Sequence, residues 1–228
     1  MEVEMESKYL DLFETFSAVT KTVLSPRTSI PSNLVEAEFR GIVGQYLQPQ
    51  RKFFNLQWLE YGLARINEYC GYINRGTSQT KFTQIDELRM AWFLHRYRPT
   101  ATASCVEARV ILTRIETGAD KVKVITDLIQ TTAGHSRYTN PAHALMQDVS
   151  IAYLGEGSRV FSEFEGRLKI ERSFGDERRC AIERRNELRE LLRNATIYQT
   201  PFFQHTRETQ AMDNIHTSIK ELAQIIEG

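Results

Sequence analysis

The sequence is poor in the residue types and patterns that mark several common classes of protein. Only three cysteines occur, Cys70, Cys105 and Cys180, and their odd number and wide spacing argue against a disulfide framework or a zinc knuckle. The 29 basic residues equal the 29 acidic residues, so no overall positive charge indicates binding to nucleic acid or to an anionic membrane. No apolar run approaches the roughly 18 residues of a membrane-spanning helix, and the acidic start MEVEMESKYL lacks the order of a signal peptide. We therefore expect a cytoplasmic protein.

Several catalytic signatures are absent as well. The sequence contains no glycine-rich phosphate loop and no G-x-S-x-G, H-E-x-x-H or C-x-x-C motif. P-loop nucleotide hydrolysis, α/β-hydrolase chemistry and zinc-protease chemistry are therefore not expected. An alternation of apolar and polar residues long enough for a β-strand is also missing.

What the sequence does contain is apolar residues at steps of three and four, the spacing of amphipathic helices. A chain of 228 residues can bury one good core and is short for two domains. We expect an all-α protein with a single domain over 1–228, consisting of an N-terminal helix and loop in 1–31 and the main body in 32–228. The expected helices cover 7–23, 32–46, 56–73, 85–97, 103–116, 120–132, a segment from 141 that stops at 155–157, 158–173, 175–194 and 206–226.

Two of the five histidines are candidates for a functional site. His95 ends the apolar segment AWFLH, and His135 ends DLIQTTAGH, so both lie beside an expected helix end, where functional side chains often gather. Both positions are also compatible with a purely structural role, such as a cationic histidine that caps helix carbonyl groups. His143 is expected in the first turn of a helix, and His205 and His216 in solvent.

Several segments resemble motifs of one known family. IYQTPFF (197–203) and ETQAMDNI (208–215) look like I-Y-x-T-x-x-F and E-x-x-A-R-x-N-L, with Met212 in place of the arginine. YLGEGSRVFSEFEGRLKIE (153–171) is similar to an L-G followed by Y-x-x-Y-x-x-x-I-R-x-E, and DLIQTTAGH (127–135) resembles L-I-x-x-T-x-x-H. These are motifs of the predicted metal-dependent phosphohydrolases of the HD superfamily, which are all-helical and of about this length. The resemblance covers nearly the whole chain from Leu34 onward and implies an HD-domain-like helical bundle.

The two histidine-rich motifs of that family are altered in this chain. RKFFNLQW (51–58) resembles R-H-Y-H-N-L-x-H, with Lys52, Phe54 and Trp58 at the three histidine positions. AWFLH (91–95) resembles A-W-F-H-D, with Leu94 at the histidine position and His95 at the aspartate position. Apolar side chains donate no electron pair to a metal ion. We therefore expect Phe54, Trp58 and Leu94 to fill the space that the metal ion occupies in the family.

The acidic motifs are altered in the same way. ASCVEA (103–108) stands in place of N-E-E-x-S-A and lacks carboxylates at the matching positions. Of D-x-D-L, only Asp148 is present, and Ser150 stands at the second aspartate. His95, His135 and Asp148 are the residual candidates for catalysis, and they are too few to hold a metal ion that activates water.

The resemblance therefore implies a pseudoenzyme: a catalytically inactive HD-phosphohydrolase-like protein with a binding or regulatory role, no metal and no other cofactor. Its partner would be another protein or a phosphorylated small molecule, and Arg51 and Lys52 are the candidate ligand-binding residues. Binding to nucleic acid or to a membrane is not expected. The charged segment 172–193 is a candidate surface for a protein partner, although such segments are usually solvated helix faces.

Two alternatives stay open at the level of the sequence. The first is an active metal-dependent phosphohydrolase on nucleotides or other phosphate esters, which would need a divalent metal such as Mn²⁺ or Mg²⁺ and ligands beyond the three residual candidates. Glu107 and Asp120 are the nearest carboxylates that no motif explains. The second is a structural subunit of a larger assembly, which would form a homo-oligomer or an obligate complex.

Overall fold

The fold consists of α-helices joined by short connections. The computed structural model describes residues 9–25, 30–75, 83–172 and 176–227. Within these segments there is no β-strand, and an isolated bridge joins Leu24 to Thr117. The elements in chain order are α1 (Leu10–Val23), α2 (Ser32–Tyr46), α3 (Leu56–Arg75), α4 (Ile85–Leu94), α5 (Ala101–Arg114), α6 (Ala119–Thr131), α7 (Pro141–Ile151), the 3-10 helix η2 (Ala152–Gly155), α8 (Ser158–Arg172), α9 (Glu177–Leu192) and α10 (Pro201–Glu227). The expected all-α class is confirmed.

Several helix ends differ from the sequence-based expectation, among them the start of α10 and the end of α4. Helix α10 begins at Pro201 rather than at 206, because proline is well suited to the first turn, where its missing N–H costs nothing. Helix α4 ends at Leu94 rather than at 97, and a turn follows in which the Tyr97 N–H donates to the Leu94 carbonyl. The prediction placed this stop immediately before Pro99, but the chain leaves the helix one turn earlier.

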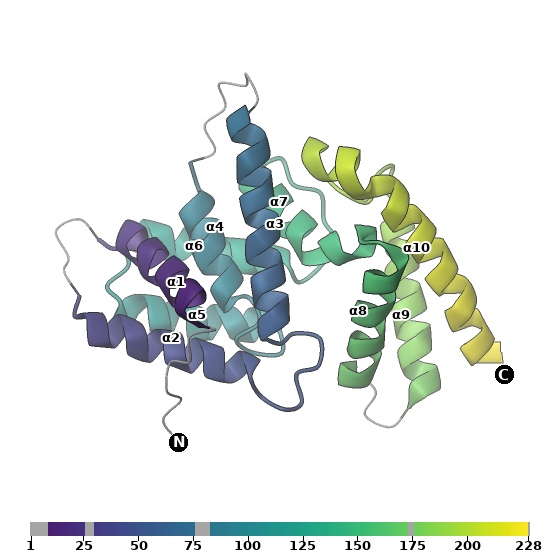
Figure 1. Ribbon diagram of the computed structural model, residues 1–228, viewed down its shortest axis with the longest axis horizontal. Helices are drawn as coiled ribbons and strands as arrows, with labels where there is room; N and C mark the ends of the chain where they lie inside the picture. Colours follow the sequence, from purple (N-terminus) through teal and green to yellow (C-terminus); the bar gives the residue numbers. More distant parts are fainter. Residues whose placement is uncertain (1–8, 26–29, 76–82, 173–175, 228) are drawn as a thin grey trace.

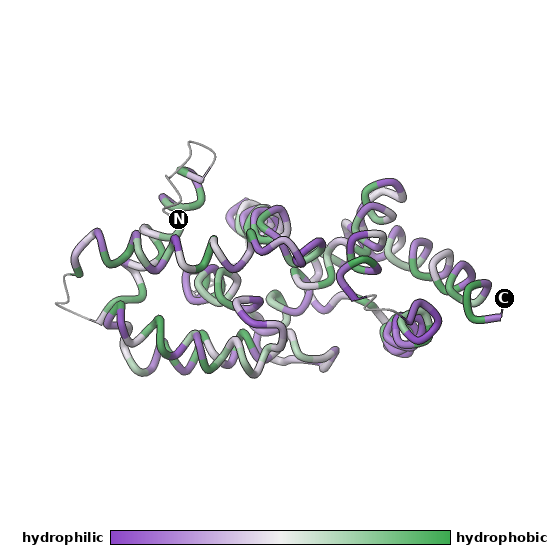
Figure 2. Tube along the Cα trace, turned by 90° about the horizontal axis from the view of Figure 1, so that it is seen from below, coloured by the Kyte–Doolittle hydropathy of each residue, from purple (hydrophilic) through white to green (hydrophobic). Residues whose placement is uncertain are grey.

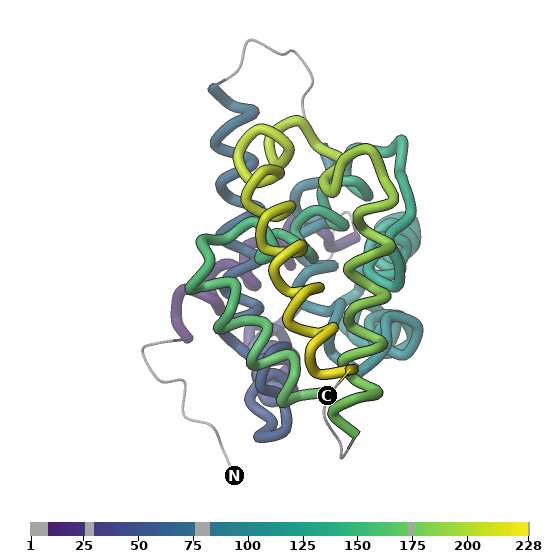
Figure 3. The backbone as a smooth tube through the Cα atoms, turned by 90° about the vertical axis from the view of Figure 1, so that its right-hand side faces the viewer, coloured from purple at the N-terminus to yellow at the C-terminus, as the bar shows by residue number. Residues whose placement is uncertain are grey.

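The molecule is elongated, and its two ends are built from different helices. Figure 1 shows α1, α2, α4, α5 and α6 at one end, α8, α9 and α10 at the other, and α3 and α7 between them. Seen from the C-terminal end, α10 lies between α8 and α9 (Figure 3). Hydrophobic and hydrophilic stretches alternate along the helices (Figure 2), as amphipathic helices require.

One apolar core extends from the first described helix to the last. Phe16 of α1 is fully buried and meets Phe93 of α4 with ring centroids 5.2 Å apart. Further along the core, Trp58 of α3 and Trp92 of α4 pack with centroids 5.6 Å apart. Helix α1, which lies in the expected N-terminal segment, is thus part of the same core as the main body. Within the described residues, no helix combines the length and the apolarity needed to cross a membrane.

A polar joint connects the C-terminal helices to the rest of the molecule. The Asn214 side chain of α10 is buried and donates to the carbonyls of Leu154 and Glu156, both at 2.8 Å. The Glu156 carboxylate accepts from the Tyr61 hydroxyl at 2.7 Å and pairs with Arg207 at 2.7 Å. Helices α3 and α10 therefore meet at the connection between η2 and α8.

Candidate functional site

Residues from five helices and their connections surround a cavity in the middle of the molecule, which we call the central pocket. Its volume is about 310 Å³. The lining contains His95 and His135, and also the aromatic residues Phe54 and Trp58. The complete lining is Phe53, Phe54, Trp58, His95, Arg96, Thr132, Ala133, Gly134, His135, Gln147, Ser150, Ile151, Tyr153, Leu168, Arg172, Arg184 and Glu187. The fold thus brings together two of the three residual candidates, while Leu94 is fully buried outside this lining.

His95 is engaged through both of its ring nitrogens. Its side chain is 1% exposed, and its ring stacks on Trp92 with centroids 4.0 Å apart. Nδ1 lies 2.7 Å from the Trp92 carbonyl, and Nε2 accepts from the Trp58 indole N–H at 3.3 Å. This pattern requires the neutral tautomer with the proton on Nδ1. Burial moves the pKa of His95 well below its usual value, so the ring stays neutral and has no lone pair available for a metal ion.

His135 lies on the loop after α6 and faces α7. The Gln147 side-chain N–H donates to its Nδ1 at 3.1 Å. Although His135 is exposed by area, the groups around its ring desolvate it enough to lower its pKa. A neutral imidazole with an acceptor at Nδ1 agrees with that shift.

Asp148 lies on α7 outside the lining of the central pocket, and its carboxylate binds the residues just before α10. Its carboxylate accepts from the Gln199 N–H at 2.8 Å, from the Thr200 N–H at 2.7 Å and from the Thr200 hydroxyl at 2.7 Å. Burial raises the pKa of Asp148 to about 7, against the effect of these hydrogen bonds. Because both oxygens satisfy donors beside a helix N-terminus, Asp148 acts as a structural cap for α10.

The two expected ligand-binding residues lie outside the central pocket. The Arg51 guanidinium donates to the carbonyls of Arg96 and Tyr97, the latter at 3.0 Å, and so ties down the turn that follows α4. Lys52 is exposed. The geometry therefore gives Arg51 a structural role and places Lys52 on the surface.

The two carboxylates that no motif explained also lie elsewhere. Glu107 pairs with Arg98 at 2.6 Å, and Asp120 is an exposed residue in the first turn of α6. In the described segments, three or more histidine, cysteine, aspartate or glutamate side chains are nowhere gathered closely enough to hold a metal ion.

The charges of the central pocket are mainly those of three arginines. Arg172 pairs with Glu187 at 2.8 Å, and Arg184 pairs with Glu165 at 2.5 Å and with Glu187 at 3.0 Å. Glu187 is the one carboxylate in the pocket lining. The walls formed by α8 and α9 are therefore largely neutralised, and the remaining positive charge is on the α4 side.

Arg96 has no ion pair with any described carboxylate. Its guanidinium lies 4.0 Å from the centroid of the Phe54 ring, its Nη1 reaches the Pro99 carbonyl at a long 3.4 Å, and its buried Nε has no hydrogen-bond partner. Burial lowers the pKa of Arg96 to about 10, which leaves the side chain cationic at neutral pH. Arg96 is thus a half-buried cation held mainly by an aromatic ring.

Arg96 also faces a second cavity of about 490 Å³ on the other side of Phe54, the outer pocket. The two pockets share Phe54, Arg96 and Arg172, and the outer pocket also contains Arg51 and Arg98. Glu171 fixes the wall between them, because its carboxylate accepts from the N–H groups of Phe53 and Phe54 at 2.6 and 3.0 Å. An anion on either side of the wall would therefore meet Arg96.

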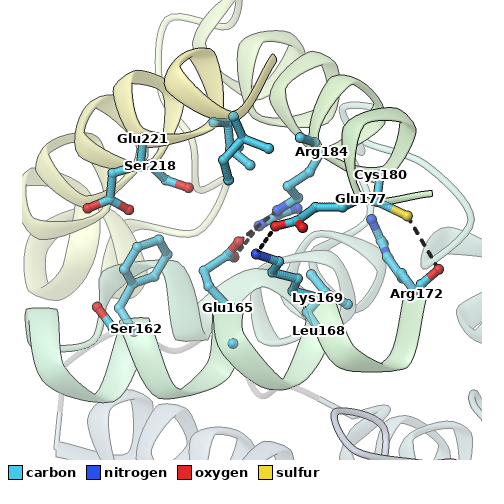
Figure 4. A pocket seen from close by; sticks show the side chains of 15 residues that line it. Ser162, Glu165, Leu168, Lys169, Arg172, Glu177, Cys180, Arg184, Ser218 and Glu221 are labelled. Atoms are coloured by element: carbon cyan, nitrogen blue, oxygen red, sulfur yellow. Dashed lines mark hydrogen bonds and ion pairs between the residues drawn. The ribbon is translucent and has the colours of Figure 1, made fainter. Parts of the chain in front are cut away.

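A third cavity, the interhelical pocket, lies between α8, α9 and α10 and has a volume of about 240 Å³ (Figure 4). Its charged side chains face one another: Arg184 pairs with Glu165, and Lys169 pairs with Glu177 at 2.5 Å. The expected partner surface in 172–193 shows the same internal pairing, for example between Arg179 and Glu183 at 2.9 Å. These regions offer few free charges to a ligand.

Several polar residues of the central pocket were not expected from the sequence, among them Arg96, Gln147, Arg172 and Arg184. Arg172 and Arg184 lie in a charged segment whose sequence is typical of a solvated helix face. Only tertiary packing turns their side chains toward the cavity. Gln147 did leave a signal, since it and Asp148 are polar residues in a mainly apolar stretch of the short helix α7, where nearly every residue is buried.

Comparison with known proteins gives no relative from which a function could be transferred. No family model matches the chain, no curated protein matches it, and no solved structure matches its fold. The HD-superfamily resemblance therefore rests on the motifs quoted above.

Proposed function

We propose that the protein is an HD-like pseudoenzyme that binds a phosphorylated small molecule in the central pocket without hydrolysing it. The observation that carries this proposal is Arg96, a half-buried cation without a carboxylate partner among the described residues. The Glu171 carboxylate acts on this cation only from beyond ion-pair distance, so a ligand that supplies a closer counter-ion would stabilise it. Arg96 borders both pockets, and we place the ligand in the central pocket because that pocket also contains the buried polar side chain of Gln147.

A phosphate group fits this environment for geometric reasons. A guanidinium offers a planar fork of N–H donors that matches two oxygens of a phosphate, and such charge-assisted hydrogen bonds are about twice as strong as neutral ones. Arg172 shares the boundary with Arg96 and lies 39% exposed, so it can turn toward an added anion. The ring of Phe54 would keep water away from one face of the ion pair.

The chemistry of the available donors supports binding without hydrolysis. A metal ion that activates water for attack on a phosphate needs several imidazole and carboxylate ligands. In this chain His95 uses both nitrogens in hydrogen bonds, and both oxygens of Asp148 hold the start of α10. His135 and Glu187 would be left as the metal-binding side chains of the pocket, and Glu187 already pairs with two arginines. We therefore propose no metal cofactor.

The proposal is tested by titrating the protein with phosphate monoesters in a calorimeter and by measuring phosphate release. Arg96→Gln is expected to weaken binding by about 10- to 100-fold, the effect of losing one charge-assisted interaction. Arg96→Lys keeps the charge but loses the fork of N–H donors, so its affinity is expected to lie between those of the wild type and Arg96→Gln. Arg159→Gln removes a guanidinium that is 92% exposed on α8 and serves as the matched control.

Two results would contradict the proposal. Unchanged affinity in Arg96→Gln would show that the anion binds elsewhere or not at all. Release of phosphate above the protein-free rate, in the presence of manganese, magnesium, cobalt or iron, would show that the site is an active phosphohydrolase.

A further inference from the structure

The side chain of Gln147 has a buried acceptor that no described residue satisfies. Gln147 lies on α7, is 2% exposed and lines the central pocket. Its Nε2 donates to His135, but its Oε1 has no hydrogen-bond partner. Buried side-chain oxygens are nearly always paired, because an unpaired one has lost its water without compensation.

Three neutral donors around the pocket are engaged elsewhere. The Ser150 hydroxyl donates to the backbone carbonyl of Gln147 at 2.7 Å, and the Thr132 hydroxyl donates to Ile129 at 2.9 Å. The Trp58 indole N–H donates to His95. No described donor reaches the Gln147 oxygen, so a hydroxyl group on a molecule in the cavity would supply the missing hydrogen bond.

We infer that the ligand of the central pocket is a small polyol phosphate, whose phosphate meets Arg96 and whose hydroxyl group donates a hydrogen bond to Oε1 of Gln147. This inference rests on the proposed function and adds the chemistry of the non-phosphate end. Arg96 follows α4 and Gln147 lies on α7, so the two groups approach the cavity from different helices. A ligand that reaches both must carry its donor away from its phosphate.

The volume and the charges of the central pocket further restrict the choice of ligand. The cavity volume of about 310 Å³ is near the lower end of the range of about 300–1,000 Å³ for small-molecule pockets, which favours a few carbon atoms beside the phosphate. Three arginines and a single glutamate line the cavity, so a cationic group on the ligand would be repelled. A hydroxyl donor is therefore favoured over an ammonium donor.

The test compares two ligands that differ in their hydroxyl groups, glycerol 3-phosphate and n-propyl phosphate, by calorimetric titration. The wild-type protein is expected to bind glycerol 3-phosphate about tenfold more tightly, the effect of one added hydrogen bond. Gln147→Leu removes the acceptor and keeps a side chain of similar size. This variant is expected to bind both ligands with the affinity that the wild type has for n-propyl phosphate. Gln147→Met serves as a second variant, and thermal unfolding of both variants shows that they are folded. Phosphoethanolamine is expected to bind more weakly than glycerol 3-phosphate.

The outcomes separate this inference from the proposed function. If neither monoester binds the wild type, the proposed function fails. If both bind equally well, or if the Gln147 variants keep the preference for glycerol 3-phosphate, the phosphate site stands and the inference about the polyol is overturned. Tighter binding of phosphoethanolamine would likewise overturn it, because the donor would then be an ammonium group.

Discussion

His95 and Arg96 are neighbours in sequence, and burial acts on them in different ways. The His95 ring is neutral, since one nitrogen donates to the Trp92 carbonyl and the other accepts from the Trp58 indole N–H. Arg96 cannot give up its charge at neutral pH, and it is held mainly by the face of Phe54. The first residue is therefore satisfied by the protein itself, while the second leaves an interaction for a ligand.

The neutral state of His95 predicts a loss of stability in mild acid. In the unfolded chain a histidine takes up a proton below about pH 6.5, whereas burial keeps the pKa of His95 in the folded protein well below that value. The unfolded state therefore binds more protons, and the free energy of unfolding falls by up to about 1.4 kcal/mol per pH unit below about pH 6.5. Urea titrations between pH 8 and pH 5 measure this slope.

A comparison with His95→Gln isolates the contribution of this residue, because other titrating groups such as Asp148 affect both proteins alike. The variant is expected to be less stable than the wild type at pH 8 and to lose less stability between pH 6.5 and pH 5. His216→Gln makes the same change on an exposed part of α10 and controls for the substitution itself. Equal slopes for wild type and His95→Gln would show that His95 is not buried in neutral form.

At the scale of single helices, the packing of α3 against α4 depends on the close approach of Trp92 to Gly62. A Cβ added at Gly62 would lie 1.9 Å from the Trp92 indole, whose N–H donates to the Leu59 carbonyl at 2.9 Å. The absence of a side chain at this position lets α4 pack directly against α3. Gly71, two and a half turns further along the same helix, has open space around it.

The same substitution at these two glycines is expected to have opposite effects. Gly62→Ala forces Trp92 out of its place and should reduce the free energy of unfolding by about 1–3 kcal/mol, as overpacking of a core does. Gly71→Ala should leave it unchanged or raise it by up to about 1 kcal/mol, because alanine favours the helix. Denaturant titrations of both variants measure these changes in the free energy of unfolding. A stable Gly62→Ala protein would be incompatible with the packing of Trp92 on α3.

The helices were largely predictable from the sequence, whereas the pocket was predictable only in part. The three- and four-residue spacing of apolar side chains is a local signal, and it located the helices to within a few residues. Helix α10 was expected too late: Pro201 is a local signal for its first turn, but the contact of Asp148 with the Thr200 N–H just before that turn joins residues distant in the sequence. The pocket combines His95 and His135 with Arg172 and Arg184, and nothing local to these arginines indicates which way they turn.

At the scale of the whole molecule, the elongated shape raises the question of what couples its two ends. Helices α8–α10 form one end and α1, α2 and α4–α6 the other, and the central pocket takes residues from both (Figure 1). A ligand there would therefore contact both ends. The joint around Glu156 lies between α3 and α10 and holds their relative position.

Removing the charge at this joint is expected to weaken the coupling between the two ends. The Glu156 side chain is 19% exposed, and its carboxylate pairs with Arg65 at 3.1 Å and with Arg207 at 2.7 Å. Glu156→Gln should lower the free energy of unfolding by about 1–3 kcal/mol, because Arg207 loses its nearest carboxylate and Arg65 keeps only Glu68 as an ion-pair partner in a partly dry environment. Glu163→Gln, in a pair on α8 with side chains 92% and 52% exposed, should change it by less than about 0.5 kcal/mol. Trp58 also meets Phe164 of α8, so the fluorescence is best read in a Trp58→Phe background, where Trp92 reports on the packing of α3 and α4. Circular dichroism reports on all helices. In Glu156→Gln the circular dichroism transition should therefore begin at lower urea than the Trp92 fluorescence transition, and coincident transitions at wild-type stability would show that the joint does not couple the two ends.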